Sequence, residues 1–395
     1  MSFLQSLADA FKGTGPVERA PLGRTFVSPW LFPDACTPAG RTFNYDAAIR
    51  ASYLQNPVAQ RAVRLVAEGV GGAPLAATTD PALTALVNAT SAGQPLLETL
   101  AAQLLLHGNG YVHILKDARG RPVELFALRP ERVRVIPGSS GWPAGYRYQV
   151  GDKAMTLEAT DDLGRPNIVH LKFFHPSDDH YGAGCLDAAD EAVAIHNAAA
   201  AWNRSLLENA ARPSGALVYD PGEPGAVLAP DQFERLKAEL AAAYAGAGNA
   251  GRPMLLEGGL KWQSLALSPA DMDFAALKAA AARDIALAFG VPPMLLGLPG
   301  DNTYANYREA NRALWRLTLL PLAGKILSGL AEGLGPWWPE ATLAIDLDRV
   351  PALAEDRERL WSQVSAAEFL SEDEKRALLG LPPAPSARAD AENKP

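Results

Sequence analysis

The stretch "GVPPMLLGLPGDNTYANYREANRALWRLTLLP", residues 290–321, joins a proline-stiffened turn, a short loop and a long helical pattern. Good N-cap side chains stand directly before the helix: Asp301, Asn302 and Thr303. The pattern predicts a helix from about Tyr304 to Glu332, about 40 Å long at about 1.5 Å per residue. Pro321 removes a backbone donor within this helix, so we expect a kink there.

A basic ridge accompanies the apolar face of this helix. Arg308, Arg312 and Arg316 recur at every fourth residue and therefore share one side. Two interpretations are open: the arginines pair with acidic groups, such as Glu309 or carboxylates of a neighbouring subunit, or they contact nucleic acid. We favour the pairing.

Upstream, two alanine-rich helical patterns flank a small mixed segment. They cover Leu186–Asn209 and Ala270–Phe289, and Arg212–Ser268 between them has strand, helix and turn signals. Small side chains let helices approach closely, so the simplest geometry is two neighbouring helices that carry a small domain at their tip. Residues of about 45–180 have the pattern of an α+β module. Proline and glycine dominate Gly13–Gly40, which is expected to be an extended arm that need not pack on its own subunit.

The composition indicates a globular protein without a strong grip on phosphate. The chain has 395 residues, 48% of them hydrophobic, and 36 Lys plus Arg stand against 44 Asp plus Glu. Tight nonspecific nucleic-acid binding needs a dense basic patch, which this balance disfavours. Cys36 and Cys185 are too few for a disulfide framework. We find no apolar run close to the roughly 20 residues of a membrane span, so no membrane contact is expected.

The search for catalytic chemistry finds little. His170, His175 and His180 recur every five residues beside Asp178 and Asp179, but none of the usual zinc spacings is present. A polar turn between a strand and a helix explains them more simply. The glycines of "HGNGY" and "EGVGG" match neither GxGxxG after a strand nor GxxxxGK[ST], and neither GxSxG nor HExxH occurs. We therefore expect no catalytic, metal or cofactor site.

Several blocks in a fixed order carry a resemblance. They are "LLLHGNGYVHILKDARGRPVELFALRPERVRV", "ARPSGALVYDP", "NAGRPMLLEGGLKWQSLALSPADMDF" and, most specifically, "FGVPPMLLG" followed by "TYANYREANRALWRLTLLP". The chain resembles the HK97-like portal proteins of tailed bacteriophages from about Asn44 to Leu381. Its alanine-rich composition would also suit the portal of a prophage-derived gene transfer agent.

The resemblance implies an α+β protomer of a ring, usually a dodecamer, at one capsid vertex of a virion or gene-transfer-agent particle made in the bacterial cytoplasm. Double-stranded DNA would pass through without being tightly bound. The implied partners are the terminase large subunit, a head-tail adaptor and the major capsid protein. The subunit number, the identity of these partners, the choice between phage and gene transfer agent, and changes on DNA filling stay open.

The resemblance also predicts the domain boundaries and the DNA-facing residues. The predicted segments are an extended N-terminal arm (1–43), a wing (44–183), a first stem helix (184–211), a clip (212–268), a second stem helix (269–290), a tunnel loop (291–303), a long helix and return strand that complete the wing (304–351), a short helical crown (352–382) and a disordered tail (383–395). The loop residues predicted to face DNA are Leu298, Pro299, Gly300, Asp301, Asn302 and Thr303.

Two other functions compete with a DNA-conducting ring. One is a head-tail adaptor or scaffold ring that never encloses DNA. The other is a metal-dependent hydrolase that would use His170, His175 and His180.

Overall fold

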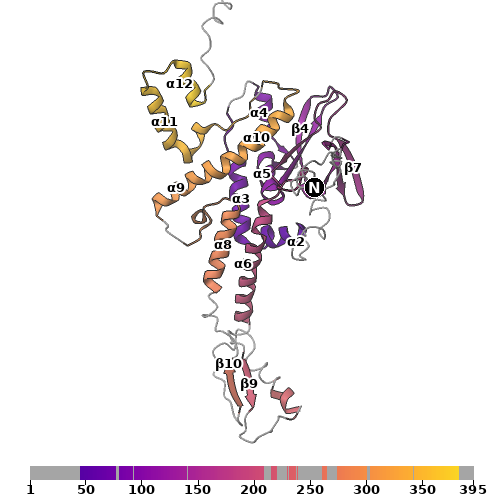
Figure 1. Ribbon diagram of the computed structural model, residues 1–395, viewed down its shortest axis with the longest axis vertical. Helices are drawn as coiled ribbons and strands as arrows, with labels where there is room; N and C mark the ends of the chain where they lie inside the picture. Colours follow the sequence, from indigo (N-terminus) through magenta and orange to yellow (C-terminus); the bar gives the residue numbers. More distant parts are fainter. Residues whose placement is uncertain are drawn as a thin grey trace, which may run out of the picture.

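The computed structural model describes most of the predicted wing, stem and crown, and only short pieces of the clip (Figure 1). The described residues are 45–76, 80–91, 93–139, 141–208, 215–219, 229, 231–236, 238, 260–264, 274–299, 303–340 and 342–381. The predicted arm (1–43), the tail (383–395), most of the clip, and Gly300, Asp301 and Asn302 of the tunnel loop lie outside them.

Helices from the first third of the described chain form the centre of the core. They are α2 (Tyr45–Ile49), the π-helical η1 (Arg50–Leu54), α3 (Pro57–Gly71), α4 (Pro81–Val87) and α5 (Leu96–His107). Asn56 caps α3 by accepting from the backbone N–H groups of Val58 and Ala59, and Pro57 occupies the first helical position. The amphipathic α3 lies along α5, and both bury their apolar faces in one large core cluster.

Two antiparallel three-stranded sheets lie beside these helices. Sheet β4-β3-β8 has β3 (Asn109–Lys116) in its centre, with β4 (Pro122–Leu128) and β8 (Ile168–Lys172) at its edges. Sheet β5-β6-β7 consists of β5 (Val133–Pro137), β6 (Pro143–Val150) and β7 (Lys153–Glu158). A 3-10 turn, η2 (Pro130–Arg132), separates β4 from β5. A short hairpin, β1 (Thr90–Ser91) with β2 (Gln94–Pro95), precedes α5.

Two long helices extend from this body. α6 (Cys185–Glu208) packs along α8 (Phe274–Ala288), as the alanine-rich patterns predicted. Alanines of both helices are buried: Ala189 and Ala199 on α6, and Ala281, Ala282 and Ala286 on α8. Beyond their far end, β9 (Gly215–Tyr219) pairs antiparallel with β10 (Leu260–Ser264) (Figure 1).

The long helix predicted from Tyr304 is present in three parts. α9 (Tyr304–Leu314) continues into the π-helical η5 (Trp315–Leu319) and then α10 (Leu320–Leu334). The π-helical segment ends two residues before Pro321, which cannot donate a regular helical hydrogen bond. The kink at Pro321 itself stays a prediction.

Contrary to the sequence expectation, Ala305–Leu334 is long and apolar enough by composition to cross a membrane. Most apolar residues of its second half are buried within this protein, however, since α10 packs against β8, α5 and α3. Packing in the core therefore accounts for its hydropathy.

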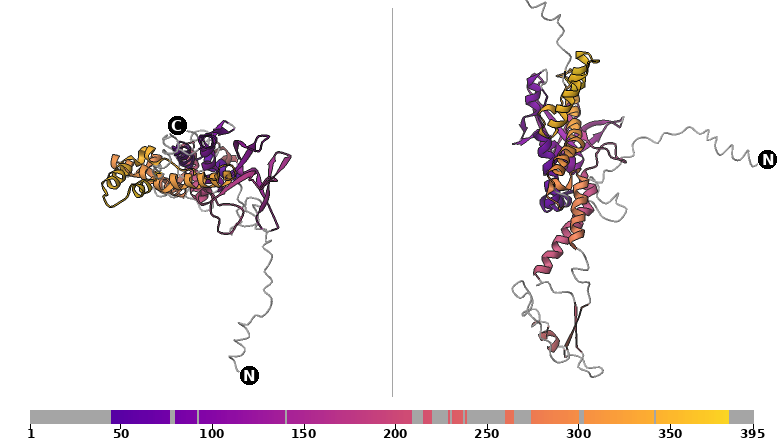
Figure 2. Two further views of the ribbon diagram at one scale, coloured as in Figure 1. Left: turned by 90° about the horizontal axis from the view of Figure 1, so that it is seen from above. Right: turned by 90° about the vertical axis from the view of Figure 1, so that its left-hand side faces the viewer.

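The C-terminal part lies at the opposite end of the molecule from β9 and β10 (Figure 1 and right-hand view of Figure 2). It comprises the 3-10 turns η6 (Leu347–Arg349) and η7 (Pro351–Leu353), then α11 (Ala354–Ala366) and α12 (Glu372–Leu379). The predicted return strand is wrong: within the described residues, this segment makes only an isolated bridge between Leu75 and Ile345. Pro74 has no N–H to donate, which limits the ladder on that side.

Candidate functional site

α8 ends in a tight turn at Gly290, which is called the hinge below. Gly290 has φ 64°, the left-handed region that favours glycine. The N–H of Gly290 donates to Leu287 O at 3.0 Å and the N–H of Val291 donates to Ala286 O at 2.9 Å. These two bonds form a Schellman motif, which satisfies the last carbonyls of the helix.

A side chain of the long helix holds this hinge in place. The Thr318 hydroxyl in η5 donates to Gly290 O at 2.6 Å. A Cβ at Gly290 would lie 2.8 Å from the Thr318 hydroxyl oxygen, so a side chain there would have to displace that hydroxyl. The end of the predicted stem helix is therefore fixed to the predicted tunnel helix by a direct bond that the sequence pattern does not reveal.

The loop between the two helices begins as a tight turn. The 3-10 helix η4 (Pro293–Leu296) ends at Gly297, whose φ is 74°. Leu298 is half-buried and Pro299 is exposed. Arg283 of α8 donates from Nη2 to Pro299 O at 2.7 Å, which ties the loop back to α8.

The beginning of α9 agrees with the capping chemistry expected from the sequence. The Thr303 hydroxyl accepts from the backbone N–H of Asn306 at 3.2 Å and so caps the helix. Thr303 thus has a structural role at the edge of the predicted tunnel loop. Whether Leu298 to Thr303 face DNA stays a prediction.

The three arginines of the ridge lie against the start of α11. Arg308 Nη1 is 2.6 Å from Glu355 Oε1, and Arg312 Nη2 is 2.9 Å from Glu355 Oε2. Asp356 Oδ2 lies 3.4 Å from Arg312 Nε and 3.9 Å from Arg316 Nη1. The ridge therefore pairs with carboxylates of its own chain.

Arg312 is the centre of this charge cluster. Its side chain is only 17% exposed, and Nη1 also lies 3.0 Å from Glu309 Oε1. Glu355 and Asp356 stand in the first turn of α11, where the helix dipole favours negative charge. Three arginines thus face three carboxylates, which leaves little net charge at this surface.

The histidines proposed for a metal site do not converge. The His170 ring stacks on Tyr111 with 4.2 Å between centroids, and its Nε2 lies 3.1 Å from Asn109 Oδ1. Burial lowers the pKa of His170 to about 3, so the ring is neutral. His175 Nδ1 accepts instead from the backbone N–H of Ser177. Among the described residues, no three potential ligands gather where a metal ion could bind.

Comparison with known proteins gives consistent matches along most of the chain. The phage portal protein family model matches residues 57–380. An uncharacterized protein of Rickettsia bellii (strain RML369-C) is 40% identical over 349 residues, covering 84% of this chain and 88% of that protein.

Two solved structures are also similar. One is a chain from the neck of a native gene transfer agent (GTA) particle computed with C12 symmetry. It is 49% identical, with a TM-score of 0.65 and coverage of 86% of this chain and 94% of that chain. The other is an HK97-family phage portal protein from Corynebacterium diphtheriae, whose likeness concerns the fold alone: it is 19% identical, with a TM-score of 0.55 and coverage of 76% of this chain and 96% of that chain.

The fold is that of a portal-type protomer. It has an α+β body, two long helices that end near a strand pair, and a loop that leads from the hinge into a long irregular helix. The chain belongs to the phage portal protein family. The α+β fold and the HK97-like resemblance expected from the sequence are therefore confirmed. The proteins of this family are structural components and not enzymes.

Proposed function

We propose that this chain forms a twelve-subunit ring at one vertex of a GTA-type particle, and that DNA enters and leaves through the ring. The observation that carries this proposal is the 49% identity, over 86% of the chain, to a protein in a GTA neck computed with C12 symmetry. The terminase large subunit would dock on the ring during packaging. A head-tail adaptor and the major capsid protein would contact it in the finished particle.

Exposed apolar side chains beside the hinge support assembly with further copies of the chain. Leu287 on α8 is 78% exposed and Leu317 on η5 is 77% exposed. Leu287 and Leu317 belong to the two segments that the bond between Thr318 and Gly290 joins. A head-to-tail ring would cover such a patch with a different surface of the next subunit.

The chemistry of the loop supports passage of DNA without tight binding. Leu298 to Thr303 contain no cationic side chain. Arg283 binds Pro299 O, and the arginines of the ridge pair with carboxylates. Since phosphate affinity grows with the number of cations that neutralise the backbone, few cations at the loop allow DNA to slide.

A photo-cross-linking experiment tests this function. A benzophenone amino acid at Leu298 should form DNA adducts in filled particles, whereas the same group at Phe369, 88% exposed between α11 and α12, should form few. Equal labelling at both positions, or none at Leu298, would favour the adaptor or scaffold ring that never encloses DNA. Electron microscopy of the purified protein provides the subunit number.

A further inference from the structure

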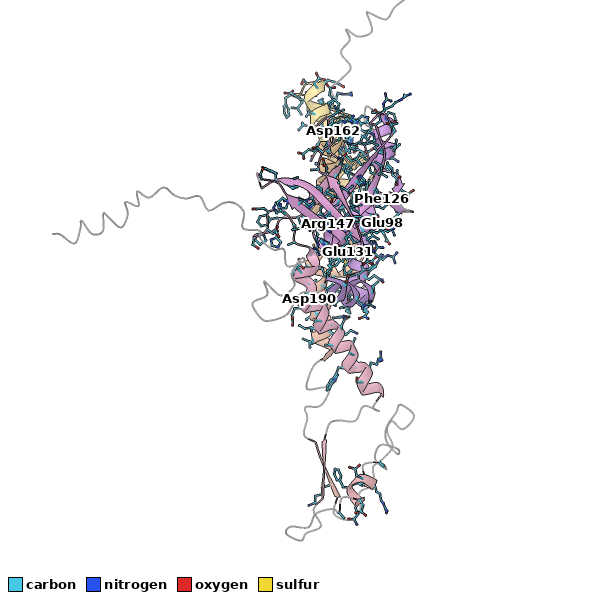
Figure 3. All side chains as sticks on the ribbon, turned by 90° about the vertical axis from the view of Figure 1, so that its right-hand side faces the viewer. Glu98, Phe126, Glu131, Arg147, Asp162 and Asp190 are labelled. Atoms are coloured by element: carbon cyan, nitrogen blue, oxygen red, sulfur yellow. The ribbon has the colours of Figure 1, made fainter. Side chains whose placement is uncertain are left out.

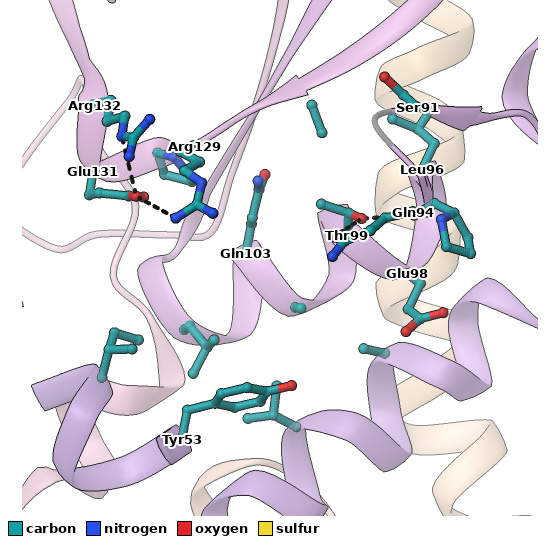
Figure 4. A pocket seen from close by; sticks show the side chains of 18 of the residues that line it. Tyr53, Ser91, Gln94, Leu96, Glu98, Thr99, Gln103, Arg129, Glu131 and Arg132 are labelled. Carbon is teal, nitrogen blue, oxygen red and sulfur yellow. Dashed lines mark hydrogen bonds and ion pairs between the residues drawn. The ribbon is translucent and has the colours of Figure 1, made fainter. Parts of the chain in front are cut away.

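A large groove on the predicted wing has no role in the function proposed above. It has a volume of about 780 Å³ and lies between α2, η1, α3, α5 and the β4–η2 segment (Figure 4). Figure 3 shows that Glu98, Phe126 and Glu131, which line it, lie close together on one face of the body.

One part of the groove lining is apolar and partly aromatic. Half-buried side chains from four elements form it: Tyr53, Ala102, Leu106, Phe126 and Tyr148. These side chains also pack against the two core clusters, which fixes this part of the lining.

The charges on the rim are largely paired with each other. Arg64 Nη2 lies 2.6 Å from Glu68 Oε1, and Arg129 Nη1 lies 3.7 Å from Glu131 Oε1. Arg132 Nε is 4.0 Å from the same glutamate oxygen. Arginines that already face carboxylates make a poor phosphate site, whereas a lining that combines apolar and aromatic side chains with polar groups suits an extended apolar peptide.

The chain itself supplies such a peptide at this place. Tyr45 and Asp46, the first described residues, line the groove, so the 44 preceding residues join the body at its wall. Within them, residues 26–33 read "FVSPWLFP", and five of these eight are large apolar residues. Two prolines favour an extended backbone, and the aromatic rings would gain most from burial.

We propose that residues 26–33 of the N-terminal arm bind in this groove of their own subunit. The 11 residues 34–44 can span at most about 36–40 Å, at 3.3–3.6 Å per residue, which is enough to fold back from Tyr45. Pro38 and Gly40 provide turn residues in this connection. The short tether raises the local concentration of the segment at its own groove above that of free chains.

Engineered cysteine pairs in the full-length assembled protein test the proposal. The parent carries Cys36→Ser, and Cys185 stays because it is partly buried and burial raises its thiol pKa to about 11. Ser28→Cys together with Thr99→Cys in the groove should give an intrachain bond under mild oxidation. The matched control pairs Ser28→Cys with Ser328→Cys, an exposed serine on α10 outside the groove, and should give at least tenfold less.

Each outcome decides the proposal. A ladder of interchain dimers would overturn the assignment to the same subunit and place the arm in a neighbour's groove. Equal yields for the test and control pairs would overturn the groove as the binding site. Trp30→Ser changes the arm alone and should lower the yield of the disulfide between the cysteines at positions 28 and 99 at least tenfold. An unchanged yield would show that the Trp30 ring does not hold the segment in the groove and would overturn the proposal.

Discussion

Replacement of Gly290 by alanine should loosen the connection between α8 and the loop that follows it. A residue with a side chain pays about 1–2 kcal/mol to adopt the left-handed conformation that Gly290 has at φ 64°. The new Cβ would also lie 2.8 Å from the Thr318 hydroxyl oxygen, so the hydroxyl must move and weaken its 2.6 Å bond to Gly290 O. A hydrogen bond of this kind contributes about 0.5–1.5 kcal/mol. The local free energy of opening should therefore fall by about 2–3 kcal/mol.

Hydrogen exchange at the Val291 amide, which donates to Ala286 O, measures this opening. A loss of about 2–3 kcal/mol corresponds to about 30- to 150-fold faster exchange, because about 1.4 kcal/mol is a factor of ten. Gly297→Ala is the matched control. Gly297 has φ 74° but no neighbouring atom within 4 Å of its Cβ position, so this variant should leave the Val291 amide nearly unchanged.

A double-mutant cycle with Thr318→Ala separates the steric effect from the backbone effect. Thr318→Ala alone removes the hydrogen bond and should speed exchange about 2- to 10-fold. In the double variant the clash is also relieved, so the combined effect should be clearly smaller than the product of the single effects. If the effects multiply, or if Gly290→Ala leaves exchange unchanged, the contact does not hold the hinge and the reasoning is wrong.

Three further predictions address other parts of the molecule. Arg312→Ala should destabilise the docking of α11 by about 1–2 kcal/mol, because the loss of a half-buried ion pair costs more than that of an exposed pair and less than that of a buried one. The protease sensitivity of α11 measures this loss. Gly329→Ala should destabilise the protein because its Cβ would overlap the Leu171 side chain. Gly324 lies in the same helix with open space around it, so Gly324→Ala should stabilise the protein by about 0.5–1 kcal/mol. Thermal unfolding of the two variants measures both effects. Burial lowers the pKa of His107 to about 4, so between about pH 6.5 and 4 the unfolded chain binds more protons at this histidine than the folded chain does. The free energy of unfolding should therefore fall by about 1.4 kcal/mol per pH unit as the pH drops through this range. His107→Gln should remove this slope, and denaturant titrations at several pH values measure it.

The sequence predicted elements well where local chemistry determines them. The hinge followed from Gly290 and the prolines after it, and the cap at Thr303 followed from residue type. Both features depend on a few neighbouring residues, so a single sequence carries the signal. The paired alanine-rich helices were also predictable, because their composition favours helix and their pattern allows close approach.

Other features depended on contacts between distant segments. The stretch from Val123 to Ile136 is rich in β-branched and other apolar residues, but η2 at Pro130 divides it between two sheets. β7 has only a weak strand signal, because "KAMTLE" has little β-branched or aromatic content. The groove has no local signature at all, since its walls come from helices and strands far apart in the sequence.

The basic ridge shows why charge spacing alone cannot assign a nucleic-acid contact. An arginine at every fourth residue of a helix, next to a loop predicted to face DNA, would suit phosphate binding by spacing and sign. In the folded chain, Glu355 and Asp356, some 40 residues further along, occupy the positions that phosphates would take. A phosphate could reach Arg312 only in competition with carboxylates, of which those of Glu309 and Glu355 lie within 3.0 Å of its guanidinium. The ridge is therefore better suited to hold α9 against α11 than to bind DNA, so its arginines do not conflict with the proposal that DNA slides past the preceding loop.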